Sequence, residues 1–211
     1  MIGFVIVVSA APARALSGKL GAQFGSVGNK LTGELPGEGK WLGRADLGYG
    51  LVAEVNLAAD IALSFQPAFS PRNTRQEFIE RDEVVATFDY EIDYLSLPLM
   101  IRVTGDPIGT RGFVTAGLDL NILLDATIGV GIGEADITDI YQSTTLGALF
   151  GAGVMVPVGR HFLTCEIRYT QGLEDMIVRD GDESEAGLDS PSVKYRGLTL
   201  MVGFLFSLGG D

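Results

Sequence analysis

Apolar and polar side chains alternate with a period of two along most of the chain after residue 15. In the clearest stretch, residues 163–170, every second residue is apolar and the charged residues Glu166 and Arg168 fall in between. Successive side chains of a β-strand point to opposite faces, so this pattern predicts a strand with one apolar face. No stretch has the helical period, and we therefore expect an all-β protein. Eight stretches predict strands, namely residues 19–24, 46–54, 60–66, 95–103, 114–124, 145–156, 163–170 and 198–206.

The links between these strands alternate between short and long. An even number of antiparallel strands, with short turns at one end and long loops at the other, is typical of outer-membrane barrels, whose short turns are periplasmic. Each strand also comes near the 9–11 residues that a tilted strand needs to cross a bilayer. We therefore expect an eight-stranded antiparallel up-and-down transmembrane β-barrel in the bacterial outer membrane, with both termini periplasmic. The short links are residues 55–59, 104–112 and 157–161, and the long ones are 29–43, 70–86, 126–143 and 175–194.

The fourth strand contains an irregularity. From Phe88 to Tyr94 the apolar residues have even numbers, whereas from Leu95 onward they have odd numbers. A β-bulge at Tyr94-Leu95 explains this reversal and lets the strand continue beyond the membrane, since a bulge switches faces by one extra residue. The alternative is that residues 87–93 form a loop.

The first 15 residues have the features of a secretory signal peptide. An apolar run at residues 2–8 is too short to be a transmembrane helix, and the small residues at 9–15 offer a cleavage site. No Lys or Arg precedes the apolar run, which leaves two alternatives, a misplaced start codon or an apolar first strand. We expect residues 1–15 to be the signal and residues 16–211 to be one barrel domain.

The composition narrows the classes of protein that remain. The 211 residues include 27 Asp+Glu and 15 Lys+Arg, a net charge of −12, yet 46% are hydrophobic and the mean hydropathy is +0.28. Such an acidic balance excludes nucleic acid as a partner, because phosphates need a basic surface. The single cysteine, Cys165, excludes an internal disulfide. The length suits one domain.

Two short runs point to a family. The run D-Y-L-S-L-P-L-M-I at residues 93–101, followed by G-F-V-T-A-G at residues 112–117, resembles the signature of PorT-like outer-membrane β-barrel domains. The Gly-rich hairpin at residues 48–69 is also similar to that family. The resemblance covers about residues 16–208 and implies an outer-membrane barrel inserted by the barrel-assembly machinery, without implying an activity. The chain departs from it at the end, because Phe206 is followed by five further residues instead of closing the chain as a terminal aromatic.

Alternation alone does not say which face of the barrel is inside. A soluble lipocalin-like barrel that binds a ligand hides its apolar face, and Gly39-Lys40-Trp41 resembles the start of that family. Against it, the less apolar face of residues 145–155 is rich in glycine and carries no charge, which suits a cramped lumen and not a solvent surface. Eight strands leave an interior that side chains fill, so we expect a plugged lumen and no general porin. The predicted lumen network comprises Lys19, Glu54, Asp60, Arg102, Asp119, Glu166 and Arg168.

The sequence contains no complete catalytic motif, and we propose no catalytic residues and no cofactor. The pattern G-x-G-x-x-A at residues 48–53 lacks the helix that a dinucleotide site requires. The sole histidine, His161, falls in a predicted periplasmic turn. A lumen pair of Glu166 and Asp119 is chemically able to transfer protons, but a structural ion network is the simpler interpretation.

The last long loop is acidic. Asp180, Asp182 and Glu185 are weak candidates for binding Ca²⁺ or Mg²⁺ through hard oxygens. An EF-hand is excluded, because its sixth position is Glu185 and its twelfth is Pro191. The default interpretation is a solvated acidic loop, and bridging to lipopolysaccharide by a divalent cation is a second hypothesis. Protein partners are expected through the loops at 70–86 and 175–194.

Aromatic residues lie near both ends of the predicted strands, as the girdles of such barrels do. Trp41, Phe69, Tyr141 and Tyr195 fall near the outer ends. Together these features predict an integral outer-membrane barrel with a structural, adhesion or accessory role. A small transport or secretion accessory barrel and the soluble ligand-binding barrel are the alternatives.

Overall fold

The computed structural model describes residues 17–32, 39–80, 83–105, 109–130, 133–176 and 194–208, and the expected signal segment lies outside them. No helix in these ranges is long and apolar enough to cross a membrane. The described chain is almost entirely strand. Its elements are β1 (Gly18–Thr32), β2 (Gly39–Asn56), β3 (Ile61–Phe65), β4 (Ala68–Pro71), β5 (Thr74–Glu80), β6 (Glu83–Thr104), β7 (Arg111–Val130), β8 (Gly133–Asp136), the 3₁₀ turn η1 (Thr138–Ile140), β9 (Thr144–Val158), β10 (His161–Gly172) and β11 (Lys194–Leu208).

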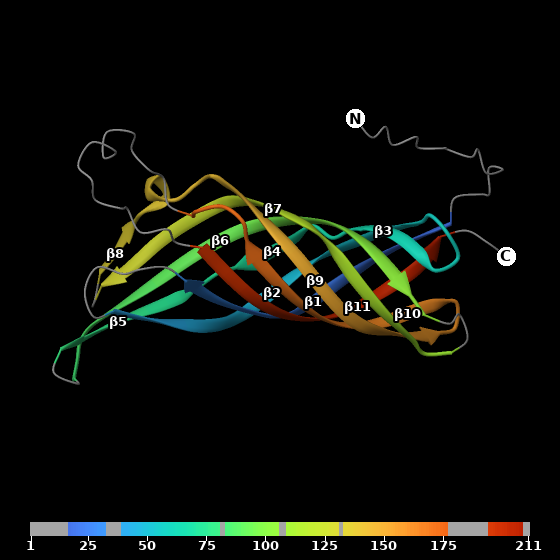
Figure 1. Cartoon of the computed structure of the whole chain (residues 1–211), viewed down its shortest axis with the longest axis horizontal. Coiled ribbons are helices and arrows are strands. Elements are labelled where there is room, and N and C mark those ends of the chain that lie inside the picture. Colours follow the sequence, from blue (N-terminus) through green and yellow to red (C-terminus); the bar gives the residue numbers. More distant parts are fainter. Residues whose placement is uncertain are drawn as a thin grey trace, which may run out of the picture.

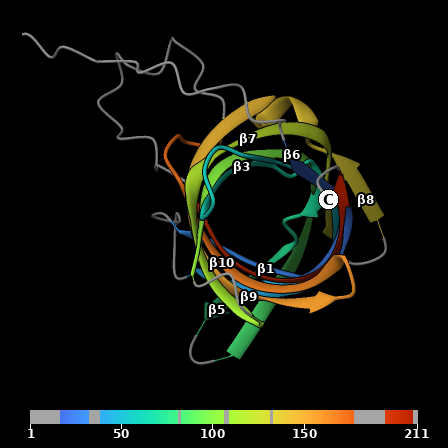
Figure 2. The same ribbon diagram turned by 90° about the vertical axis from the view of Figure 1, so that its right-hand side faces the viewer.

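The strands close into a barrel with eight strand positions, each of which is called a stave below. β3, β4 and β5 follow one another in the space between β2 and β6, so they form a single interrupted stave, while β8 only extends a hairpin with β7. The first stave, β1, pairs antiparallel with both β2 and the last stave, β11. Figure 2 shows the resulting ring end-on. The expected eight-stranded antiparallel up-and-down barrel is confirmed.

The β2–β3, β6–β7 and β9–β10 turns lie at one end of the barrel (Figure 1). Gly18 pairs with Leu208, so the two ends of the described strands meet there, at the right of Figure 1. Gly109 and Gly159 lie in these turns with φ of 76° and 63°, a backbone conformation that glycine adopts without a steric penalty. The opposite end carries the long excursions of β5 and β8 (Figure 1).

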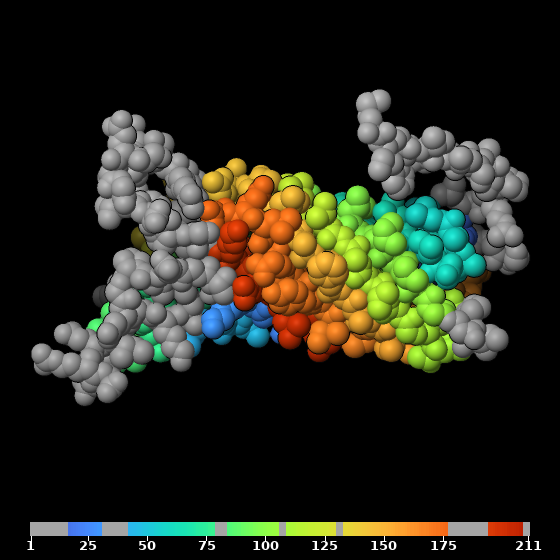
Figure 3. Space-filling model, viewed as in Figure 1, coloured from blue at the N-terminus to red at the C-terminus, as the bar shows by residue number. Residues whose placement is uncertain are grey.

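The apolar face of the strands points outward. Phe24 and Phe150 are each 60% exposed, and Leu118 is 51% exposed. Figure 3 shows one side of this wall, over β7, β9 and β10, as a continuous surface. A lipocalin-like barrel would bury these side chains, so the soluble ligand-binding alternative is wrong. The inward face of β9 is small as expected, since a Cβ on Gly151 would lie 2.5 Å from the Thr115 hydroxyl.

The irregularity near residue 94 lies between β6 and its partner. The β6–β7 register shifts between Asp93 and Tyr94, and Leu124 of β7 is the unpaired extra residue. Inward residues of β7 change from odd to even numbers there, whereas β6 keeps its even residues inward throughout. The alternative that residues 87–93 form a loop is wrong, because β6 is one strand of 22 residues.

The same residues of β6 therefore face inward on both sides of Tyr94-Leu95, but the interior side chains change from polar to apolar there. We call the part with the apolar outer wall, which reaches up to Leu95 of β6 and Leu124 of β7, the membrane half. The part beyond it is the loop half, whose interior is an apolar cluster. The long loops expected at 29–43, 70–86 and 126–143 are largely strand instead, because the barrel continues into this half. The cluster comprises Ile92, Tyr94, Ala126, Tyr141, Met176 and Tyr195.

Two of the expected girdle aromatics are interior residues. Tyr141 and Tyr195 are buried in the cluster of the loop half, so the girdle prediction is wrong for them. Phe69 does face outward and stacks on Tyr49, with ring centroids 5.4 Å apart. The side chain of Trp41 lies outside the described part of the chain.

Candidate functional site

A chain of ion pairs crosses the lumen of the membrane half. The Glu54 carboxylate of β2 lies 3.1 Å from Lys19 Nζ of β1 and also contacts the Arg102 guanidinium of β6. Arg102 also forms an ion pair with Glu166 of β10 at 3.4 Å, and Glu166 forms another with Arg168 at 3.1 Å. All five side chains point inward because they occupy the inward phase of four different staves. The alternation of charge offsets the desolvation cost of burying each group.

Neutral side chains complete this layer. The Thr115 hydroxyl donates to Glu166 Oε1 at 2.8 Å, and Arg168 Nη2 donates to Gln66 Oε1 at 2.6 Å. Gln66 lies at the break between β3 and β4, where its backbone N–H donates to the Pro98 carbonyl. Gln66 keeps the inward phase of Ala62 and Ser64, so its long polar side chain lies in the lumen as the alternation of residues 60–66 indicates.

A second layer lies toward the loop half and is built around Arg72. This residue occupies the break between β4 and β5 and is fully enclosed by the barrel. Its Nη2 donates to Asn121 Oδ1, and its guanidinium carbon lies 3.6 Å from the ring centroid of Tyr195 and 4.6 Å from that of Tyr94. A guanidinium against two aromatic faces is a favourable cation–π arrangement. Arg72 therefore ties the polar interior to the apolar cluster.

Asp119 is the carboxylate of this second layer. Its Oδ2 lies 3.7 Å from Arg72 Nη2, and its Oδ1 accepts a hydrogen bond of 2.6 Å from Ser96. Asn121 donates to the Tyr195 hydroxyl at 3.1 Å, which links the layer to β11. Asp119 and Glu166 belong to different layers, in agreement with the expectation of a structural ion network instead of a proton-transfer pair.

The structure places most of the expected lumen residues where the alternation put them. Lys19, Glu54, Arg102, Glu166 and Arg168 form the first layer and Asp119 joins the second. Asp60 is a correction, since it is exposed on the turn before β3 and takes part in neither layer.

Sequence reasoning missed two members of the layers. Arg72 fell within a predicted long loop and Tyr195 was assigned to the outer girdle, because period-two alternation did not reveal how far the strands continue. Gln66 has the inward phase of the strand predicted at 60–66, but the expected network contained charged residues alone. The one sequence signal was the reversal of phase at Tyr94-Leu95, which marks where the interior becomes apolar.

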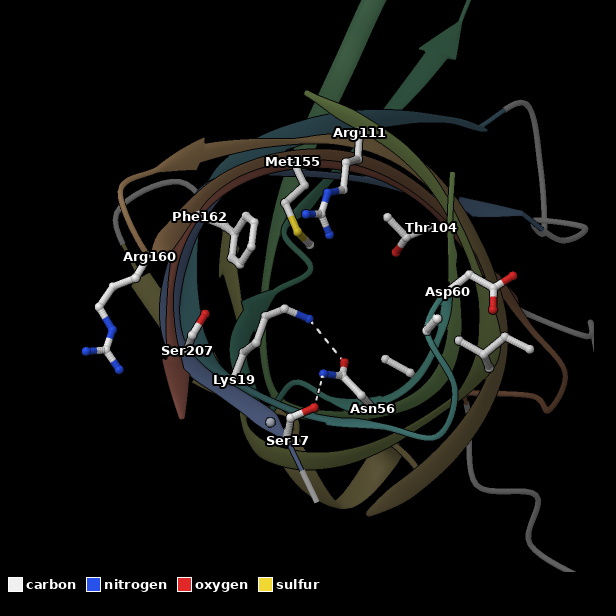
Figure 4. A pocket seen from close by; sticks show the side chains of 14 residues that line it. Ser17, Lys19, Asn56, Asp60, Thr104, Arg111, Met155, Arg160, Phe162 and Ser207 are labelled. Atoms are coloured by element: carbon white, nitrogen blue, oxygen red, sulfur yellow. Dashed lines mark hydrogen bonds between the residues drawn. The ribbon is translucent and has the colours of Figure 1, made fainter. Parts of the chain in front are cut away.

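A cavity of about 470 Å³ opens at the short-turn mouth, below the first layer (Figure 4). Lys19 and Arg111 reach into it, while Arg160 points away from its centre. Lys19 Nζ donates to Asn56 Oδ1 at 3.3 Å, and Asn56 Nδ2 donates to the Ser17 hydroxyl at 2.8 Å. The mouth is thus open but lined by cations.

The remaining site predictions are only partly within the described ranges. His161 lies at the β9–β10 turn as expected, and its ring packs against Phe204 and Phe206. In the part of the chain that the structure describes, no group of three or more His, Cys, Asp or Glu side chains is arranged to hold a metal ion. The weak metal candidates Asp180, Asp182 and Glu185 lie outside that part.

The outer wall of the loop half is charged. Arg75 of β5 donates to Asp89 of β6 at 2.8 Å, and this hydrogen bond holds the pKa of Asp89 below its ordinary value. Nearby, Asp93 of β6 lies directly opposite Asp125 of β7. Partial burial, followed by the charge of Asp125, raises the pKa of Asp93.

Comparison with known families decides the class of the protein. Residues 13–178 match the family described as outer membrane protein beta-barrel domain. The chain belongs to this family. As a member it is an integral barrel of the bacterial outer membrane. The match is to this broader family and does not single out the PorT-like domains.

Solved structures with a similar fold share little sequence with this member of the family. The outer membrane protein OprG from Pseudomonas aeruginosa is 14% identical, the match covers 93% of this chain and 97% of that one, and the TM-score is 0.59. Neisserial surface protein A is 15% identical over 87% of this chain and 95% of its own, with a TM-score of 0.46. No curated protein sequence matches the chain. The likeness to OprG shows a shared fold and nothing further.

Proposed function

We propose that this family member is a closed outer-membrane barrel with a structural, adhesion or accessory role, and that it is not an enzyme. The observation that carries the proposal is the double polar layer, in which Glu54, Arg102 and Glu166 bridge opposite walls of the lumen. In eight-stranded barrels the side chains nearly fill the interior, so a paired network leaves no path for hydrated solutes.

The proposal includes an orientation and a set of partners. The short turns and both termini face the periplasm, and the loop half projects outside the cell, as in other barrels of this kind. The barrel-assembly machinery inserts the chain, and outer-membrane lipid and lipopolysaccharide surround it. Protein partners bind through the segments at 70–86 and 175–194. In this view the molecule acts through its loop half.

The second candidate is a small transport or secretion accessory barrel of the PorT-like kind. It is favoured by the runs at residues 93–101 and 112–117, which resemble that signature. In that case the lumen charges separate in the working state, or a larger complex recruits the barrel.

Single-channel recording in planar bilayers separates the two candidates. The proposal expects no conductance steps from the refolded protein, and stable steps from the double variant Arg102→Ala/Glu166→Ala. This variant removes one cation and one anion, so the lumen keeps its net charge while its plug is shortened. The matched control is Arg75→Ala/Asp89→Ala on the outer wall, which should stay closed. Steps from the unaltered protein would overturn the closed barrel, and a double variant that stays closed would show that the network is not the plug.

A further inference from the structure

The cavity at the short-turn mouth has the chemistry of a ligand site. We propose that it binds a small organic anion, one that carries a phosphate or carboxylate on an apolar group. Its volume of about 470 Å³ lies in the range of small-molecule sites, which is roughly 300–1,000 Å³. The cavity lies below the first polar layer and shares only Lys19 with it.

The mouth of the lumen carries an excess of positive charge. In the described part of the chain, the first layer and the mouth hold four cations and two carboxylates, in a protein whose net charge is −12. Asp60 and Arg160 are exposed at the rim and are not among the enclosed charges. Enclosed charges are normally balanced, and two positive charges here are not, which indicates an anion as the absent partner. The cations are Lys19, Arg102, Arg111 and Arg168, and the carboxylates are Glu54 and Glu166.

Arg111, the first residue of β7, has an unsatisfied hydrogen-bond donor. Its Nε is buried without a hydrogen-bond partner, and its guanidinium carbon lies 5.3 Å from the ring centroid of Phe162. An arginine has five N–H donors in a planar fork that fits phosphate and carboxylate oxygens. Figure 4 shows this guanidinium directed into the opening, where an incoming anion would meet it.

Lys19 provides a second donor on the other side of the opening. Its ammonium group has three N–H donors, of which Glu54 and Asn56 accept two, at 3.1 Å and 3.3 Å. The third donor is available to a ligand in the cavity. An oxyanion between Arg111 and Lys19 would therefore contact two cations from opposite walls (Figure 4).

The cavity also offers a contact surface for the apolar part of the ligand. Phe162 and Met155 line the same cavity, and both belong to or pack against the buried cluster at this end of the lumen. Lys19 Nζ also lies 5.8 Å from the centroid of Phe162, so the ring stands beside both cations. Apolar surface next to the cations favours an organic anion over inorganic phosphate.

The test follows the methionine methyl groups of the refolded full barrel by NMR while phenyl phosphate is added. Met155 lines the cavity, whereas Met176 is enclosed in the loop half and serves as the internal control. We expect a saturable shift of the Met155 signal, no shift of Met176, and binding of inorganic phosphate that is weaker by about tenfold because it lacks the apolar contact. The Met155 signal is assigned by Met155→Leu.

Variants decide whether the cations are responsible. Arg111→Gln should weaken phenyl phosphate binding about tenfold or more, because it removes the charge-assisted hydrogen bonds. Arg160→Gln, which removes the same charge from a side chain that points away, should leave the binding unchanged. Folding of each variant is checked by the faster migration of the unboiled protein. Three results would overturn the proposal: no Met155 shift, an equal shift with neutral benzyl alcohol, or equal weakening by both variants.

Discussion

The membrane half and the loop half of this barrel bury opposite kinds of side chain with one continuous set of strands. In the membrane half the interior holds buried ion pairs such as Glu54–Arg102, and the outer wall is apolar. In the loop half Ile92 and Tyr94 are buried inside, and acidic residues such as Asp93 face outward. The loop half is thus organised like a soluble protein and the membrane half like its inverse.

The solvent outside each half explains the difference. Lipid accepts apolar side chains and excludes charged ones, so the polar residues of the membrane half turn inward and satisfy one another. Beyond Leu95 the wall meets water, and burial of apolar surface becomes the favourable term again. The strand β6 passes from one regime to the other without changing which residues face inward.

The largest effect is expected in the interior of the membrane half. Arg102→Ala removes the cation that Glu54 and Glu166 share and leaves each with one other partner, Lys19 or Arg168. Breaking a buried ion pair by removing one partner costs about 3–5 kcal/mol of the free energy of unfolding. Urea unfolding in detergent micelles, followed by the gel migration of the unboiled protein, measures this loss. The matched control is Arg75→Ala on the outer wall, where both partners are solvated and no resolvable change is expected. Equal losses of stability in the two variants would show that interior and surface charges do not differ in their contribution to the free energy of unfolding.

The next effect concerns the apolar interior of the loop half. Ile92→Ala removes a fully buried side chain and should cost about 2–5 kcal/mol, because the cavity it leaves only partly collapses. Limited proteolysis of the loop half should become faster while the membrane half stays protected. Leu99→Ala, on the lipid-facing side of the same strand, should cost much less, since lipid refills the space. If Leu99→Ala is the more damaging of the two, the assignment of faces in β6 is wrong.

A charge placed on the outer wall should distinguish the two halves directly. Leu118→Lys puts an ammonium group on the lipid face near the middle of its strand, at a cost of about 2–4 kcal/mol. Val85→Lys makes the same kind of change at an outward apolar residue of the loop half, which is 59% exposed, and should be tolerated. Urea unfolding of both variants in lipid vesicles measures the difference. Equal costs would place both residues in the same environment and remove the boundary between the halves.

The membrane half could be predicted from the sequence, because one rule governs it throughout. Alternation located every stave there, and it oriented Glu54, Arg102, Glu166 and Arg168 correctly. Arg72 escaped prediction because it stands at a break between strands, within a predicted loop, where alternation was not applied. The loop half escaped because its apolar residues turn inward. A β-bulge does lie at the expected place, but its extra residue is Leu124 of β7, and the phase reversal in β6 follows from the change of surroundings.

The smallest effect is expected on the outer wall at the boundary of the two halves. Asp93 lies directly opposite Asp125, and like charges in this position destabilise a sheet. Asp93→Asn should therefore raise the free energy of unfolding at pH 7 by about 0.2–1 kcal/mol. The folded protein raises the pKa of Asp93 above its ordinary 3.8, through partial burial and then the charges of Asp125, Glu91 and Asp46. Protonated Asp93 therefore contributes to the free energy of unfolding in full below pH 3.8. This contribution is lost as the pH rises through the raised pKa.

The pH dependence separates this repulsion from a simple change of polarity. The advantage of Asp93→Asn should shrink as the pH falls through the raised pKa, because the unaltered Asp93 then becomes neutral as well. Asp89→Asn is the matched control on the same strand, since Asp89 is paired with Arg75 and its pKa is lowered. That variant should lose stability at pH 7, and the loss should fade only when the pH drops below the ordinary range of an aspartate. Urea titrations of the two variants at pH 7 and pH 3 measure both trends, and an advantage of Asp93→Asn that persists at pH 3 would show that the facing carboxylates do not repel each other.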